Sequence, residues 1–132
     1  MQDHDDAYRL VRATYSVAHM SDAKWVRLFN LCIDSGVTID RAVWRFIDRE
    51  HVLTSGLPRA GDLLPTRFAD GRFQPVEYKW ILSIFVPRVY RVMAGVGATR
   101  PQDVARLRAA LEGRGSFPLV EREDGLTLVA YE

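Results

Sequence analysis

The sequence predicts an α+β domain: a small antiparallel sheet of about four or five strands with two or three helices packed on one face. Segments with apolar residues three and four positions apart alternate with segments in which every second residue is apolar. The chain also closes on an Asp-Gly turn between two apolar runs. Its 132 residues fit one ordinary domain, and 48% hydrophobic and 27% charged residues are typical of a globular one.

Two helices are predicted in the first third of the chain. Residues 5–18 have apolar side chains at helical spacing and begin with acidic residues, which suit the positive end of a helix dipole. Residues 22–35 follow Ser21, a favourable N-cap, and stop at Gly36, which tolerates the left-handed conformation. The apolar stripe of this second helix consists of Trp25, Leu28, Phe29 and Cys32.

The position of Met20 suggests where the domain begins. This residue stands directly before the cap of the second helix, so residues 1–19 are predicted to be a helical extension and residues 20–132 a single α+β domain. A third helix is expected to start at Pro101, which fits the first turn of a helix, and to end at Gly113.

Strands are predicted where β-branched and aromatic residues alternate. Residues 41–48 fit this pattern, although Asp40 could also cap a helix there. Residues 76–82 fit it as well, and a further strand at 89–93 could pair with them in antiparallel fashion. Between these segments, residues 54–75 contain three glycines and three prolines, which predicts a long loop or a series of short pieces.

The end of the chain, residues 117–131, is predicted to be a β-hairpin that turns at Asp124-Gly125. Two registers are compatible with the sequence. A two-residue loop would pair Glu123 with Leu126. A three-residue loop would pair Arg122 with Leu126 and match the apolar side chains of the two strands better.

The composition excludes several classes of function. Eighteen basic and seventeen acidic residues give a net charge of +1, so no overall field attracts nucleic acid or an anionic membrane. The single cysteine, Cys32, can form neither an internal disulfide nor a cysteine-based zinc site. No apolar run approaches the roughly 20 residues that cross a bilayer, and the acidic N-terminus differs from a secretory signal, which predicts a cytoplasmic protein.

Charge is unevenly distributed along the chain. Residues 79–114 carry seven basic and two acidic side chains, a net charge of +5, and residues 115–132 carry one basic and four acidic ones, a net charge of −3. Binding of nucleic acid by the basic segment is therefore an alternative function. Arg106 and Arg108 would diverge by about 200° around a helix, which argues against a single basic stripe.

Acid–base chemistry could arise at one histidine and at two pairs of carboxylates. His51 lies close to Asp48 and Glu50, so a carboxylate-supported base could form there, but a surface histidine in a charged turn fits the pattern better. Asp48 and Glu50, or Glu121 and Glu123, could form an acid dyad on one side of a strand. The second pair fits a solvated strand edge better.

Nucleophile, phosphate and metal chemistry have weaker support. Cys32 lies on an apolar helix face, which favours a small buried hydrophobe over a nucleophile. The segment GVGATR (residues 95–100) lacks the spacing of a phosphate-binding loop, and no two histidines have the spacing of a metal site. The sequence therefore predicts no cofactor and no metal.

Two motifs carry a resemblance to a family. They are the run Lys24-Trp25 with Leu28-Phe29, and the run Phe117-Pro118-Leu119, Glu121 and Gly125-Leu126. Over residues 20–131 the chain resembles a family of small bacterial proteins of unknown function with an N-terminal KWxxLF helix and a C-terminal FPLxExxxGL hairpin. The motif residues are aromatic, apolar and turn-forming, so the resemblance implies a fold and no catalytic residue. Small bacterial proteins of this kind often act as immunity or adaptor proteins, which makes that role an expectation here.

These observations predict a non-enzymatic protein-binding module, most concretely an immunity protein that neutralises a toxin or effector by occlusion. A protein partner is expected, and neither nucleic acid nor a membrane is. The predicted contact residues are Trp44, Arg45, Arg67, Arg72, Arg88, Tyr90 and Arg91, with Trp44 useful only if exposed. The alternatives are a nucleic-acid-associated module that uses residues 79–114 and a small ligand-binding protein or hydrolase around His51.

Overall fold

The computed structural model describes residues 15, 17–48, 50–69, 75–93 and 96–132. In chain order the elements are α2 (Asp22–Asp34), β1 (Ala42–Phe46), β2 (Val52–Ser55), η1 (Ala60–Asp62), β3 (Arg67–Phe68), β4 (Val76–Glu77), η2 (Tyr78–Trp80), β5 (Ile81–Pro87), β6 (Val89–Met93), β7 (Val96–Pro101), α3 (Val104–Leu111), β8 (Leu119–Arg122) and β9 (Gly125–Val129), where η marks a 3₁₀ turn.

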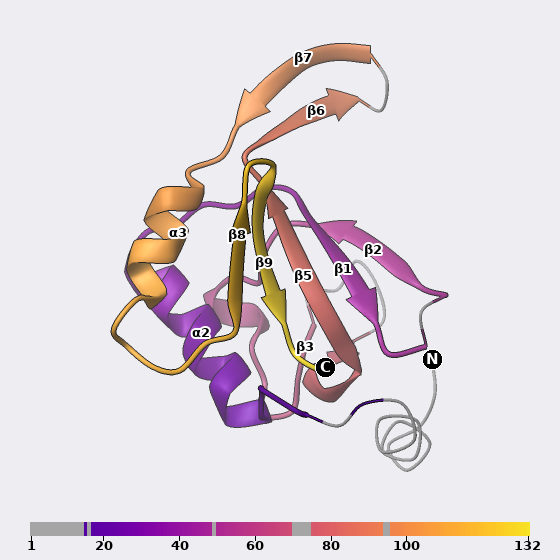
Figure 1. The fold of residues 1–132 in the computed structure, drawn as a ribbon, viewed down its shortest axis with the longest axis vertical. Helices are drawn as coiled ribbons and strands as arrows, with labels where there is room; N and C mark the ends of the chain where they lie inside the picture. Colours follow the sequence, from indigo (N-terminus) through magenta and orange to yellow (C-terminus); the bar gives the residue numbers. More distant parts are fainter. Residues whose placement is uncertain (1–14, 16, 49, 70–74, 94–95) are drawn as a thin grey trace.

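Five strands form one antiparallel sheet in the order β2-β1-β5-β9-β8, which confirms the α+β class (Figure 1). Cross-strand pairing places Trp44, Ile84 and Leu128 in one row, and all three side chains are buried. Helices α2 and α3 add apolar side chains to the same buried cluster as this row. These side chains are Trp25, Leu28, Phe29 and Cys32 from α2 and Val104, Leu107 and Leu111 from α3.

Helix α2 and strand β1 form where the sequence predicts them. The Ser21 hydroxyl accepts a hydrogen bond from the backbone N–H of Lys24 at 3.2 Å, and Gly36 follows the helix with a φ of 68°. The predicted loop at residues 54–75 contains short pieces, namely the end of β2, η1 and β3.

The predicted strand at residues 76–82 is only partly correct, because residues 78–80 form a 3₁₀ turn and β5 begins at Ile81. The predicted strand at 89–93 exists as β6, but its pairing with the preceding strand is wrong. Strand β5 is flanked by β1 and β9, so neither of its edges is available to β6. Strand β6 therefore pairs with β7, and Pro101 ends β7 opposite Val89 instead of starting a helix.

The predicted N-terminal helix lies largely outside the described residues, which begin at Tyr15. Its last residues, Val17 and Ala18, are extended, so the prediction is wrong there. The backbone N–H of Val17 donates to the Glu132 carbonyl, and the Glu132 N–H donates back, both at 2.9 Å. Ala18 pairs with Tyr131, so this segment is joined to the residues that follow β9.

The C-terminal hairpin is confirmed, but both predicted registers are wrong. Arg122 pairs with Gly125 across a two-residue turn of Glu123 and Asp124. Gly125 lies within β9, at a position with no room for a side chain. A Cβ atom on it would lie 2.2 Å from the carbonyl oxygen of Val86. Gly125 thus marks a close approach of two strands and only Asp124 is in the turn, whereas the prediction placed both residues in the turn.

Candidate functional site

The predicted contact residues do not form one surface. Trp44 is fully buried and its indole N–H donates to the Ser55 carbonyl at 3.2 Å, so its assignment as a contact residue is wrong. Arg45 is exposed on β1 and pairs with Ser83 of β5. Arg88 follows Ser83 by five residues, or roughly 17 Å of extended chain, so Arg45 and Arg88 are far apart. Arg67 is exposed in the separate β3–β4 pair, and Arg72 lies outside the described residues.

The hairpin β6–β7, called the arm below, is the most distinctive surface feature. It projects from one end of the five-stranded sheet, and within the described ranges its two strands pair only with each other (Figure 1). Val89 is 53% exposed and Val92 43% exposed, and Arg91 is also exposed. Two of the predicted contact residues, Tyr90 and Arg91, are in the arm.

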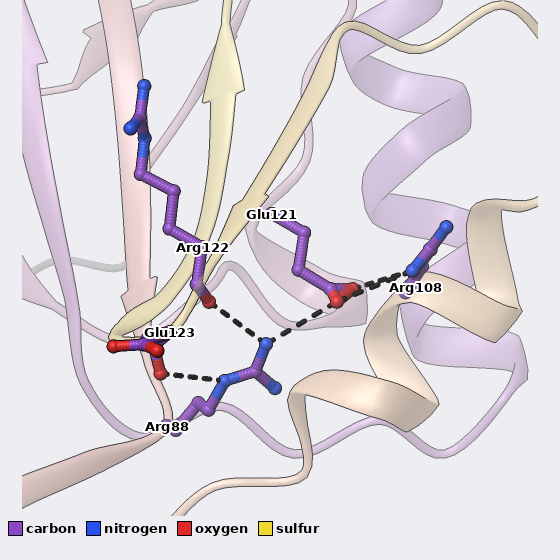
Figure 2. Close-up of polar contacts among 5 residues, drawn as sticks. All are labelled: Arg88, Arg108, Glu121, Arg122 and Glu123. Atoms are coloured by element: carbon purple, nitrogen blue, oxygen red, sulfur yellow. Dashed lines mark hydrogen bonds and ion pairs between the residues drawn. The ribbon is translucent and has the colours of Figure 1, made fainter.

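The first attachment of the arm is Arg88, between β5 and β6. Its backbone N–H donates to the Asp124 carbonyl at 3.0 Å. Its guanidinium donates to the carbonyls of Glu123 and Arg122 and to the Glu121 carboxylate, at 3.1, 3.0 and 3.4 Å (Figure 2). Arg88 therefore ties the base of the arm to the β8–β9 turn, so it is a positioning residue more than the contact residue predicted.

Glu121 links this attachment to helix α3. Its carboxylate accepts a hydrogen bond from Arg108 at 2.8 Å on the side opposite Arg88 (Figure 2). The hydrogen bond and charge of Arg108, followed by those of Arg88, lower the pKa of Glu121. Glu121 thus belongs to a structural ion-pair network between two arginines, which excludes the acid dyad with Glu123.

Gln102, which sequence reasoning missed, is the second attachment. Its side-chain oxygen accepts from the backbone N–H groups of Asp40 and Arg41 at 3.0 and 2.9 Å. Its side-chain nitrogen donates to the carbonyls of Arg41 and Pro87, both at 2.9 Å. Its backbone N–H donates to the Arg88 carbonyl at 2.7 Å, which closes the base of the arm. A lone glutamine after a proline gives no sequence signal of this kind.

One face of the arm gathers positive charge around a tyrosine. The Arg41 guanidinium carbon lies 5.2 Å from the centre of the Tyr90 ring, a cation–π contact. Arg100 is the cross-strand partner of Tyr90, so its side chain is on the same face. Within the described part of the chain, no carboxylate pairs with Arg41, Arg91 or Arg100.

The other arginines of the basic segment do not extend this face. Arg106 donates to the Ser35 carbonyl at 3.1 Å, whereas Arg88 and Arg108 share Glu121. Two of these arginines thus share one carboxylate on the surface, and a third is directed to the end of α2. The arginines of residues 79–114, which the sequence suggests as a nucleic-acid-binding segment, therefore do not share one face.

His51 lies in the tight turn between β1 and β2. Its Nδ1 lies 2.5 Å from the Asp48 carboxylate, and its side chain is 60% exposed. Burial alone would raise the pKa of Asp48, but hydrogen bonds from the His51 side chain and from the backbone N–H groups of His51 and Glu50 outweigh it and lower that pKa. Among the described residues, His51 is thus an exposed histidine hydrogen-bonded to Asp48.

Cys32 is 3% exposed, and burial raises the pKa of its thiol to about 12, which confirms the interpretation as a buried hydrophobe. It borders a cleft of about 590 Å³ between the end of α2 and residues 56–59. Among the residues the structure describes, no three His, Cys, Asp or Glu side chains gather where they could hold a metal ion.

No family model, no curated protein and no solved structure matches the chain. Within the described ranges, neither helix is long and apolar enough to cross a membrane.

Proposed function

We propose that this protein is a non-enzymatic protein-binding module and that the arm β6–β7 is its contact element. The observation that carries the proposal is a two-stranded hairpin, attached at its base, whose strands pair with no other strand that the structure describes. A hairpin with no third strand or helix against it is marginally stable in water. A partner that covers it would supply the missing packing.

The attachment at Arg88 and Gln102 favours binding by a preorganised element. Both ends of the arm are fixed to neighbouring turns by side-chain hydrogen bonds, so its direction is set before a partner arrives. Preorganisation lowers the entropy lost on association. The exposed Val89 and Val92, together with Tyr90 and nearby arginines, provide the apolar, aromatic and guanidinium groups on which protein interfaces depend.

The base of the arm allows a clean test by excision. Because Arg88 and Gln102 are already joined by a backbone hydrogen bond, residues 89–101 can be replaced by an Asn-Gly turn. The full chain would be used to isolate a partner from the native host, and the partner would then be purified and titrated by calorimetry. We expect a stoichiometric complex with the full chain and a loss of about 100-fold or more in affinity for the excised variant.

Two surface valines provide a matched pair of point variants. Val89→Ser is in the arm and Val52→Ser is in edge strand β2, and the two side chains are 53% and 51% exposed. We expect only Val89→Ser to weaken the complex. Equal binding by the excised variant, with cooperative unfolding that shows the rest of the chain is folded, would refute the arm as the contact element.

The more specific form of the proposal is neutralisation of a toxin or effector by occlusion, and it rests on the resemblance to small bacterial proteins described above. Co-expression tests it: the full chain should restore growth to cells that produce the partner, and the excised chain should not. A purified partner with no toxicity in those cells would limit the proposal to protein binding.

A further inference from the structure

We infer that the face of the arm with Tyr90 and Arg100, together with the adjoining Arg41, binds a carboxylate-rich segment of the partner protein. This inference rests on the proposed function and names the chemistry of the partner. The carrying observation is the arrangement of two arginines beside one aromatic ring, with no acidic side chain of the described chain paired with either.

The position of Arg41 is set by the fold. Gln102 holds both the backbone N–H and the carbonyl of Arg41, and the guanidinium then lies over the Tyr90 ring. A cation–π contact occupies no hydrogen-bond acceptor, so the N–H donors of the Arg41 guanidinium are available to a carboxylate. Arg100 supplies a second fork of donors from the neighbouring strand, so one carboxylate or two adjacent ones could be bound by both.

Charge complementarity identifies the partner as acidic. The arm sequence from Val89 to Pro101 contains Arg91 and Arg100 and no acidic residue. Arg88 and Arg108, a short distance away at the base, are paired with Glu121. Arg88, which attaches the base of the arm, thus has a carboxylate partner within the fold, whereas Arg91 and Arg100 have none among the described residues. A carboxylate of the partner protein would provide the counter-charge.

A protein segment fits this face better than nucleic acid does. Glu123 and Asp124 form the turn to which Arg88 attaches the base of the arm, so they would repel a polyanion that extended past it. Tyr90 is half-buried with Arg41 over its ring, which leaves little of the ring for base stacking. The positive face is also small, whereas nucleic-acid binding needs a basic stripe that spans several phosphates.

The test uses a probe of defined chemistry, an acetylated peptide of about 12 residues that alternates Glu and Gly, titrated at low salt into the ¹⁵N-labelled full chain. Arginine side-chain Nε–Hε signals report on each guanidinium. We expect the signals of Arg41 and Arg100 to shift together and saturably. Arg100→Gln and Arg41→Gln should each weaken binding roughly tenfold, because each removes a charge-assisted pair of hydrogen bonds.

Arg91→Gln is the matched control, because Arg91 pairs with Thr99 and therefore lies on the opposite face of the same hairpin. It should leave the affinity within about twofold. Equal loss for Arg91→Gln and Arg100→Gln would overturn the inference, since the peptide would then sense only total charge. Tighter binding of a single-stranded oligothymidylate of similar length would overturn it in favour of nucleic acid.

Binding of these variants to the partner purified from the native host distinguishes this inference from the proposed function. If excision of the arm abolishes the complex while Arg100→Gln and Arg41→Gln bind normally, the arm remains the contact element and the acidic-segment inference fails. If all three variants bind normally, both fail.

Discussion

Replacement of Gln102 by alanine should lower the free energy of unfolding, because this one side chain is hydrogen-bonded to the backbone at three positions. The side chain makes four hydrogen bonds, two from backbone N–H groups at Asp40 and Arg41 and two to the carbonyls of Arg41 and Pro87. Gln102→Ala removes all four at once. The bond from Asp40 is exposed and the other three are partly buried, so water replaces these bonds only in part.

The magnitude follows from the number of bonds. A net contribution of about 0.5–1.5 kcal/mol for each hydrogen bond, reduced by entering water, gives a loss of about 3 kcal/mol in the free energy of unfolding. That is a large fraction of the roughly 5–15 kcal/mol that stabilises a typical domain. For a chain of this length it corresponds to a drop of roughly 10 °C in Tm.

Urea denaturation followed by tryptophan fluorescence measures this loss, because Trp25 and Trp44 are buried and report on the core. The midpoint should fall while the slope stays constant, since the surface exposed on unfolding hardly changes. A loss below about 1 kcal/mol would refute the view that Gln102 supports the base of the arm.

Gln102→Glu is a second variant with its own signature. A carboxylate keeps the acceptor for Asp40 and Arg41 but places negative charge against the carbonyls of Arg41 and Pro87. The folded state then favours the protonated form and raises the pKa of the introduced carboxyl above its unfolded value. The variant should therefore be closest to wild type at acidic pH and lose stability as the pH rises through the raised pKa.

Three further outcomes are expected. Gly125→Ala should cost about 3 kcal/mol or more because its Cβ would meet the Val86 carbonyl, whereas Gly61→Ala, with open space around it, should change the urea midpoint little. Cys32, with its pKa raised to about 12 by burial, should react with a thiol reagent at pH 8 only in denaturant; fast labelling of the native protein would contradict its burial. Asp48→Asn should lower stability at neutral pH, and the difference should vanish as the pH falls through the lowered pKa of Asp48, below its ordinary value of 3.8; a difference that persists at pH 2 would show that the carboxylate charge is not responsible.

Local signals were sufficient for the elements that carry their own end markers. Ser21 and Gly36 enclose α2, and the apolar stripe from Trp25 to Cys32 is its buried face, because a cap and a periodicity are properties of consecutive residues. The α+β class followed from the same patterns. Much of the candidate site is beyond such patterns. They indicate Tyr90 and Arg91 as contact residues, but they also indicate Trp44, which is buried, and they give no signal for Gln102.

Composition and local patterns were enough to establish the class of fold, α2, β1 and the existence of the last hairpin. Tertiary structure decided that β6 leaves the sheet, since β1 and β9 occupy both edges of β5, and that Gly125 is needed for a close approach to Val86. It also decided which arginines are paired, because Glu121 reaches Arg88 and Arg108 only after β8, α3 and the base of the arm have come together. Hydrogen-bonding capacity and charge are fixed by residue type, but their partners are selected by packing between segments far apart in the chain.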